Sequence, residues 1–227
     1  MWNIHREDLT ANYKYLLPKQ SCMLFTLKEF FDVIMMTIGV GFIFMNRFGI
    51  PAVRQSVTSY IEDPVAYYQQ ALSKKISRFD WNSLWIACLI TAPAVIFHEL
   101  AHKLAALSYG LQATFHAAYF WLSFGIIMKL LNTGFIFFVP GYVSFSAPTS
   151  PIQSALIAFA GPFLNLVLWF TCWAILKFKM ITMTTRTMHI LAATRFINGF
   201  LFIFNMIPLG FFDGAKVLEG VVHYFSG

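Results

Sequence analysis

The clearest chemical pattern in this sequence is His-Glu-x-x-His at residues 98–102, inside a long apolar run. On a helix, residues four apart share a face, so the imidazoles of His98 and His102 can bind one metal ion. Glu99 lies beside them and can reach a water at that ion as a general base. The pattern predicts a zinc site with hydrolytic chemistry.

The apolar setting of this pattern strengthens the metal interpretation. In a soluble protein a lone His-Glu-x-x-His is weak evidence, because it arises by chance. Two histidines and a carboxylate within a membrane span are costly, and such residues are functional by default. The alternative is a polar cluster that only locks helices together.

A zinc site needs a third protein ligand and an open position for water. Beyond residue 80, the only carboxylates besides Glu99 are Asp213 and Glu219. Pro208 and Gly210 interrupt the helix before Asp213, so that its side chain can turn inward. Glu219 stands in a charged tail and is expected on a solvated face. Asp213 is therefore the predicted third ligand.

The composition predicts a protein whose solvent is lipid. Of the 227 residues, 58% are hydrophobic and only 11% are charged, against roughly 25% charged in a soluble domain. These values exclude a disordered chain, a disulfide scaffold and a nucleic-acid-binding domain. The formal net charge of +6 is expected from basic residues at lipid headgroups.

The acidic residues divide the chain into two parts. Seven of the ten fall in residues 1–80, which we expect to form a polar tail without a secretory signal, one transmembrane helix and an interfacial linker. Residues 81–227 are expected to form the metalloprotein core. A crossing helix needs about 20 mainly apolar residues, and the candidates are 31–45, 81–107, 117–139, 152–176 and 187–207.

The span at 117–139 is expected not to cross as a single helix. The histidines and Asp213 both lie toward the C-terminal ends of their spans, so these two helices must run parallel to share a metal. Residues 152–176 supply one crossing between them, so residues 117–148 must return to their starting side. The Phe- and Val-rich stretch 134–145 is broken by Pro140-Gly141, which predicts two short strands about a turn.

These strands must be buried in protein or line a wet cavity, because an open strand cannot face lipid. One possibility is that a strand edge within 134–146 binds an unwound substrate by strand addition. The other is that the strands only fill a gap. The expected fold is an all-α polytopic membrane bundle with a small membrane-embedded β-hairpin or re-entrant segment.

Three motifs in this order resemble the site-2 protease family of intramembrane zinc metalloproteases. They are the His-Glu-x-x-His pattern, Ala-Gly-Pro-Phe-Leu-Asn at 160–165, and Asn-x-x-Pro-x-x-x-x-Asp-Gly at 205–214. The resemblance implies His98, His102 and Asp213 as ligands of Zn²⁺ and Glu99 as the catalytic acid/base. It also implies that Asn205 contacts the substrate or the oxyanion.

The resemblance covers residues 81–214 and corresponds to a minimal core form without an added soluble regulatory domain. Many members carry a second glycine after Asp-Gly, where this chain has Ala215. The implied partners are a transmembrane protein substrate and the lipid bilayer, with no nucleic acid. The implied location is the cell membrane, as a multi-pass protein with the metal nearer the cytosol, although the distribution of Lys and Arg between the loops leans the other way.

Other polar residues in the spans have less specific roles. Arg195 and Asn198 share a helical stripe with Asn205 and are expected to join helices or anchor at the interface. For Asn165, structural packing is at least as good an explanation as catalysis. His116 and His189 have no partner spacing and are expected to be structural.

The predicted activity is peptide-bond hydrolysis within the bilayer. Two alternatives stay open: a membrane metal-binding protein or transporter, and a protease-like scaffold without activity. Transport favours carboxylates or histidines staged along a path, whereas this chain concentrates its carboxylates at one site. An intact Glu99 argues against an inactive scaffold.

Overall fold

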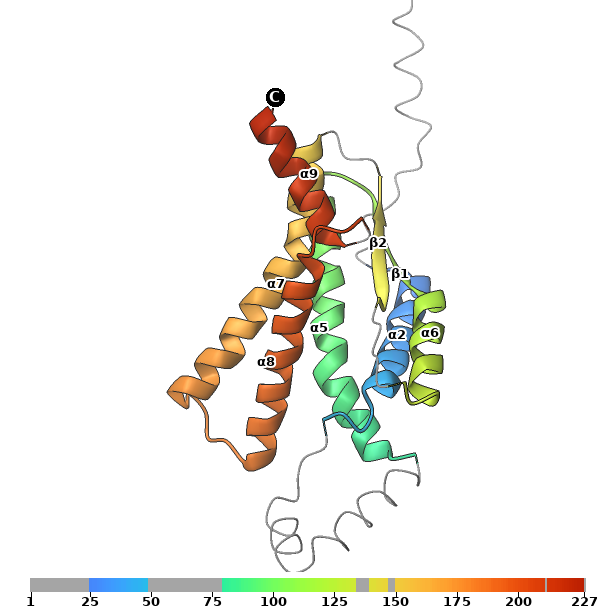
Figure 1. Cartoon of the computed structure of the whole chain (residues 1–227), viewed down its shortest axis with the longest axis vertical. Coiled ribbons are helices and arrows are strands. Elements are labelled where there is room, and N and C mark those ends of the chain that lie inside the picture. The colour runs from blue at the N-terminus through green and yellow to red at the C-terminus, as the bar shows by residue number, and fades with distance from the viewer. Residues whose placement is uncertain (1–24, 49–78, 134–138, 147–149, 211, 227) are drawn as a thin grey trace, which may run out of the picture.

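A computed structural model describes residues 25–48, 79–133, 139–146, 150–210 and 212–226. It is a helical bundle with a small antiparallel sheet packed on one side (Figure 1). The elements are α2 (Leu27–Phe44), α5 (Trp81–Ser108), β1 (Ala113–Ala117), α6 (Tyr119–Leu130), β2 (Gly141–Phe145), α7 (Pro151–Phe178), α8 (Thr185–Asn205) and α9 (Asp213–Ser226). The fold class expected from the sequence is confirmed.

Three of these helices are long and apolar enough to cross a membrane, namely α5, α7 and α8. At 1.5 Å per residue, the 28 residues of α5 extend about 42 Å, which exceeds the roughly 30 Å hydrocarbon core. The predicted crossing at 31–45 forms α2 but is not among the three candidates. Its first two turns carry Lys28, Glu29 and Asp32, and its role as a crossing stays a prediction.

Each of the three long helices begins after an N-cap residue whose side chain accepts a hydrogen bond from a backbone amide. Asp80 accepts a hydrogen bond from the Asn82 amide at 3.0 Å and caps α5. Ser150 caps α7 directly before Pro151, and Thr184 caps α8. An N-cap side chain satisfies an amide that has no partner within the helix.

The direction of the helices agrees with the predicted topology. In Figure 1, α5 and α8 run upward side by side, and α7 runs in the opposite direction between them in the chain order. The C-terminal ends of α5 and α8 therefore meet at the same level, close to the start of α9. This parallel arrangement is the one that a shared metal requires.

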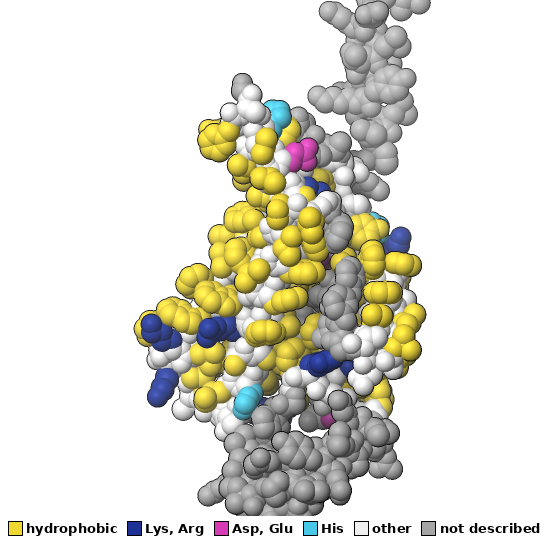
Figure 2. Space-filling view, viewed as in Figure 1, with side chains coloured by type: hydrophobic (Ala, Val, Ile, Leu, Met, Phe, Trp, Pro, Cys, Tyr) yellow, Lys and Arg dark blue, Asp and Glu magenta, His cyan; other side chains and the backbone are white. Residues whose placement is uncertain are grey.

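The bundle has an apolar surface, unlike a soluble protein, and its apolar core also contains buried polar side chains. Figure 2 shows hydrophobic side chains covering most of the visible surface of α7 and α8, and the largest exposed ones include Phe163, Phe170, Phe196 and Ile203. The buried side chains include Thr91, His98, Glu99, His102, Lys103, Asn165 and Asn198. Apolar groups face lipid, so the polar groups must find partners inside the bundle.

The segment predicted not to cross as a single helix contains α6, whose 12 residues extend only about 18 Å. The chain then returns as β2, and the expectation that this segment does not make one full crossing is confirmed. One of the two predicted strands is present as β2. Strand β2 pairs with β1, so that Phe115 faces Val143; the other predicted strand falls on 134–138, outside the described residues. The five residues of Ala113–Ala117 are too few to predict a strand from their pattern alone.

Helices α2 and α5 approach each other closely at Gly41. A Cβ atom on Gly41 would lie 2.1 Å from the Cys88 sulfur but 3.4 Å from the Cys88 Cα and Cβ. The glycine lets α2 lie against α5, as small residues commonly do between membrane helices.

We expect Gly41→Ala to lower the thermal unfolding midpoint in detergent, because overpacking costs about 1–3 kcal/mol. The double variant Gly41→Ala/Cys88→Ala should recover most of the loss, because removing the sulfur leaves room for the methyl group. An unchanged midpoint for Gly41→Ala would show that the Cys88 sulfur can turn away and that this contact does not limit stability.

Candidate metal centre

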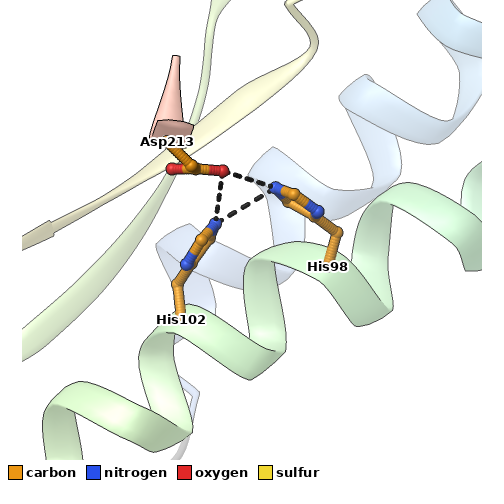
Figure 3. A group of neighbouring side chains, drawn as sticks. All are labelled: His98, His102 and Asp213. Carbon is orange, nitrogen blue, oxygen red and sulfur yellow. Dashed lines mark hydrogen bonds and ion pairs between the residues drawn. The ribbon is translucent and has the colours of Figure 1, made fainter. Parts of the chain in front are cut away.

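Two imidazoles and one carboxylate meet at the ends of α5 and α8. The Nε2 atoms of His98 and His102 lie 3.3 Å and 3.2 Å from Oδ2 of Asp213 and 3.1 Å from each other (Figure 3). The three side chains form a group that could hold a metal ion, because their ligand atoms all lie within 4.8 Å of one another. The three residues predicted as zinc ligands are thus brought together.

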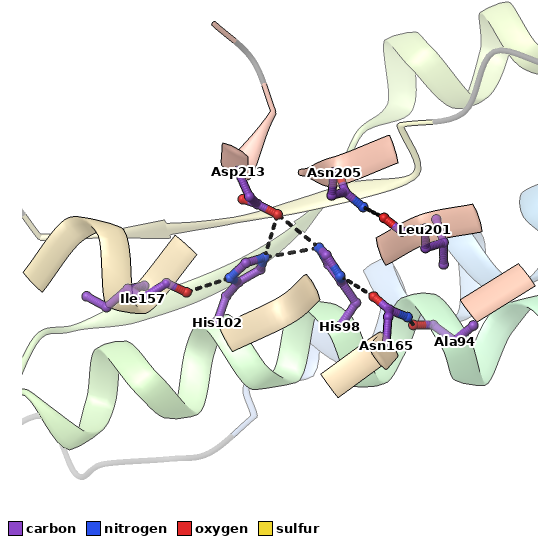
Figure 4. Close-up of polar contacts among 8 residues, drawn as sticks. All are labelled: Ala94, His98, His102, Ile157, Asn165, Leu201, Asn205 and Asp213. Carbon is purple, nitrogen blue, oxygen red and sulfur yellow. Dashed lines mark hydrogen bonds and ion pairs between the residues drawn. The ribbon is translucent and has the colours of Figure 1, made fainter. Parts of the chain in front are cut away.

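Hydrogen bonds on the far side of each ring orient the two imidazoles. Nδ1 of His102 lies 2.8 Å from the Ile157 carbonyl oxygen, which can only accept, so Nδ1 carries the proton. Nδ1 of His98 lies 2.5 Å from Oδ1 of Asn165 (Figure 4). The Asn165 amide nitrogen already donates elsewhere, so its oxygen accepts from His98.

With both Nδ1 atoms protonated, a neutral imidazole presents a lone pair at each Nε2. The two lone pairs and the Asp213 carboxylate oxygen then point into one small volume. Three acceptors at these distances repel one another unless a proton or a metal cation lies between them. The donor set of two nitrogens and one oxygen is the kind that Zn²⁺ binds at a catalytic site, with a fourth position left open.

Asn165 ties this centre to all three spanning helices. This residue belongs to α7, and its Oδ1 accepts a hydrogen bond from His98 on α5. Its Nδ2 group donates to the Ala94 carbonyl of α5 at 3.1 Å and to Oδ1 of Asn198 on α8 at 2.9 Å. Asn165 and Asn198 are both fully buried. The expected role of Asn198 in joining helices is confirmed.

Gly161 lets α7 pass directly over the two histidines. A Cβ atom at this position would lie 2.4 Å from Nε2 of His102 and 2.8 Å from Cε1 of His98. Any side chain here would displace the rings that form the centre. The position of the two imidazole rings therefore requires a residue without a side chain at Gly161 of the Ala-Gly-Pro motif.

Asp213 reaches the centre through a break after α8. The helix ends at Asn205, and Asp213 begins α9, where the helix dipole favours a negative charge. Gly214 makes this turn possible, since a Cβ atom there would lie 2.4 Å from the Met206 carbonyl oxygen.

A cavity of about 150 Å³ opens on the centre. Its lining includes Glu99, Asn205 and residues of β2 together with the three candidate ligands. None of the described residues hydrogen-bonds the Glu99 carboxylate, whereas Asn205 donates to the Leu201 carbonyl at 3.0 Å on its own helix. Both predicted catalytic residues thus line the cavity that opens on the three candidate ligands.

The remaining polar residues lie elsewhere. His116 contacts Ser144 across the sheet at 2.9 Å, and His189 lies in the second turn of α8. Arg195 lies 5.5 Å from the Trp169 ring on α7, which fits an interhelical role.

Sequence reasoning missed the support that Asn165 and Ile157 give to the histidines. The motif at 160–165 held the signal for Asn165, because the spacing from Gly161 to Asn165 is one helical turn. A backbone carbonyl such as that of Ile157 leaves no signal in a sequence.

Comparison with known proteins identifies the family. The model of peptidase family M50 matches residues 85–227, which is more than half of the chain. The chain belongs to peptidase family M50. As the sequence motifs implied, the chain is a member of the site-2 protease family. Membership of this family indicates a membrane-type zinc metallopeptidase.

Two relatives carry the name "Putative zinc metalloprotease". The protein of Methanocaldococcus jannaschii is 35% identical over 136 residues, which cover 59% of this chain and 69% of that protein. The protein of Synechocystis is 27% identical over 205 residues, which cover 85% of this chain but only 49% of that protein. No solved structure matches the chain. The family and these names indicate zinc as the cofactor.

We expect Gly161→Ala to weaken zinc binding by about 10–100-fold, as loss of groups that orient metal ligands does, because the added methyl group would occupy the space of the His102 ring. Zinc per protein, measured by mass spectrometry after dialysis against a chelator, would show the change. Gly199→Ala is the matched control, since its methyl group would meet Trp169 at 2.7 Å, away from the centre. Equal zinc loss in both variants would contradict a specific role for Gly161.

Proposed function

We propose that this chain is an intramembrane endopeptidase that hydrolyses peptide bonds within or near transmembrane segments of membrane proteins, as in regulated intramembrane proteolysis. In this proposal His98, His102 and Asp213 are the zinc ligands, Glu99 is the acid/base and Asn205 contacts the oxyanion. We further propose that residues 81–227 form the catalytic core of a multi-pass protein of the cell membrane.

The observation that carries the proposal is the convergence of three acceptor atoms beside Glu99 in one cavity among lipid-crossing helices. Zinc bound by such a set lowers the pKa of water and polarises a carbonyl group. The Glu99 carboxylate would take a proton from the attacking water and later return it to the departing amine as the C–N bond breaks. The second N–H of the Asn205 amide would donate to the oxyanion.

A substrate for this cavity must arrive as an extended chain, because a helix hides its peptide bonds in its own hydrogen bonds. Among the described residues, only β1 pairs with strand β2, and the other edge of β2 suits such a chain. The Ser146 amide donates to the Gln112 carbonyl and the Ala118 amide to the Pro140 carbonyl, both at 3.0 Å. In an antiparallel pair, hydrogen-bonded residues alternate along each strand.

This alternation fixes which backbone groups of β2 face away from β1. They are the N–H and C=O groups of Gly141, Val143 and Phe145, and all three residues line the cavity. No described residue hydrogen-bonds these groups. An unwound substrate could add to this edge as a third strand, with its backbone held beside the metal centre.

Metal transport is the competing function, and it predicts polar residues along a path through the bilayer. Among the described residues, the carboxylates of the long helices and the start of α9 gather at one centre instead. This distribution favours hydrolysis.

We expect Glu99→Gln to reduce cleavage of a transmembrane peptide by about 100-fold or more, because a general base contributes 10²–10⁴-fold. Zinc content should stay at the wild-type level, since Glu99 is not a proposed ligand. The measurement pairs mass spectrometry of products with zinc analysis in detergent. His102→Ala is the control, which should lose both zinc and activity.

Two results would argue against the proposal. Full activity in Glu99→Gln would remove its proposed role. Zinc uptake into liposomes by wild type, without cleavage of any of several transmembrane peptides, would favour transport.

Strand addition makes a separate prediction about the substrate. We expect N-methylation of a single peptide bond near the cleavage site to slow hydrolysis only when the methyl group lies on alternate residues, because only alternate N–H groups face the β2 edge. Each bond would cost roughly fivefold to tenfold in kcat/KM. Methylated peptides that show no alternation would contradict binding as a third strand.

A further inference from the structure

Glu29 and Lys103 form a buried ion pair outside the metal centre. Their side chains are 1% and 2% exposed, respectively. A buried charge pair is costly, and is tolerated only where further hydrogen bonds satisfy both groups. The mechanism proposed above uses neither residue, so the pair needs its own explanation.

The Glu29 carboxylate joins three separate elements. Its Oε1 accepts from the Lys103 ammonium group of α5 and from the Phe115 amide of β1, the latter at 2.7 Å. Its Oε2 accepts from the Thr26 amide at 2.7 Å, which completes the capping box of α2. One side chain thus fixes α2, α5 and β1 relative to one another.

The two contacts across the bundle end on elements that matter for hydrolysis. Lys103 directly follows His102 on α5. Phe115 faces Val143 in the register of the sheet, and Val143 belongs to the β2 edge that lines the cavity. The Phe115 amide points away from β2, which is why Glu29 can reach it from α2.

We propose that Glu29 is a positioning residue that sets the register between the β1–β2 sheet and the metal-binding turn of α5. It thereby selects which peptide bond of an added substrate strand lies at the metal centre. This inference rests on the proposed function. It also makes a structural statement, that the Phe115 amide is held by Glu29, which can be tested without activity.

A merely structural ion pair behaves differently from a positioning residue. Loss of a structural contact reduces the fraction of folded enzyme, which lowers all products together. Loss of register changes the ratio of products cut at neighbouring bonds. The product ratio therefore separates the two roles.

The test compares two double variants, Glu29→Leu/Lys103→Met and Glu29→Gln/Lys103→Met. Both remove the two charges, which avoids an unpaired buried charge, and apolar replacement of such pairs is often tolerated. Only the Gln variant keeps an acceptor for the Phe115 amide. Lys129→Met is a further control, because Lys129 donates to the Ile43 and Met45 carbonyls at the other end of α2.

Cleavage of a transmembrane peptide is followed by mass spectrometry, and hydrogen exchange is measured over residues 113–117. We expect the Leu variant to lose roughly fivefold to tenfold in kcat/KM at the main bond, with new cuts at adjacent bonds, as loss of one buried hydrogen bond implies. Amides of β1 should exchange faster by a similar factor, while those of α7 and α8 stay unchanged. The Gln variant and Lys129→Met should keep the wild-type product ratio.

The same product ratio and the same β1 exchange in both double variants would overturn the inference. If the Leu variant does not fold, Glu29→Asp replaces it. The flexible Lys103 can follow the shorter side chain, but the Phe115 amide cannot, so the same spread of cuts is expected. If zinc-loaded wild type cleaves no peptide, the proposed function fails, and β1 exchange alone decides whether Glu29 anchors the strand.

Discussion

Three hydrogen-bond acceptors lie in contact at the centre of this bundle, and the surrounding structure holds them there. The Nε2 atoms of His98 and His102 and an oxygen of Asp213 are all within 3.3 Å of one another. In a low-dielectric interior such an arrangement is repulsive unless a proton or a metal cation lies between the three atoms. A metal offsets this repulsion only while it is bound. Other contacts must therefore hold the three ligand side chains in place when the metal is absent. Asn165, the Ile157 carbonyl and the missing side chain of Gly161 supply them.

The same constraint explains the order of the helices. Two ligands come from α5 and the third follows α8, so these helices must run in parallel, and α7 must return between them. Helix α7 then lies across the histidines and carries both groups that orient their rings. The packing of α7 is therefore part of the metal centre, and the buried Asn165–Asn198 contact extends the support to α8.

The candidate ligands could be predicted from the sequence because the chain has so few carboxylates beyond residue 80. The parallel helices followed from the positions of those ligands within their spans. The partner of β2 could not be predicted, because Ala113–Ala117 is five residues long and lies between two apolar runs. The Glu29–Lys103 pair was also hidden, since nothing in the local sequence links residues 74 positions apart. Local motifs reveal helix-borne chemistry, whereas contacts between distant elements depend on the packing itself.

The two-stranded sheet has two edges, and the chain treats them differently. An edge strand presents unpaired backbone groups that a membrane interior cannot hydrate. On the β1 edge, the Phe115 amide is bound by the chain's own Glu29. On the β2 edge, the groups of Gly141, Val143 and Phe145 face the cavity without a partner among the described residues. A backbone edge left without partners would be costly in the resting protein, and in the proposed function an extended substrate would supply those partners. The asymmetry between the two edges thus connects the proposed positioning role of Glu29 to the proposed recognition of an unwound chain.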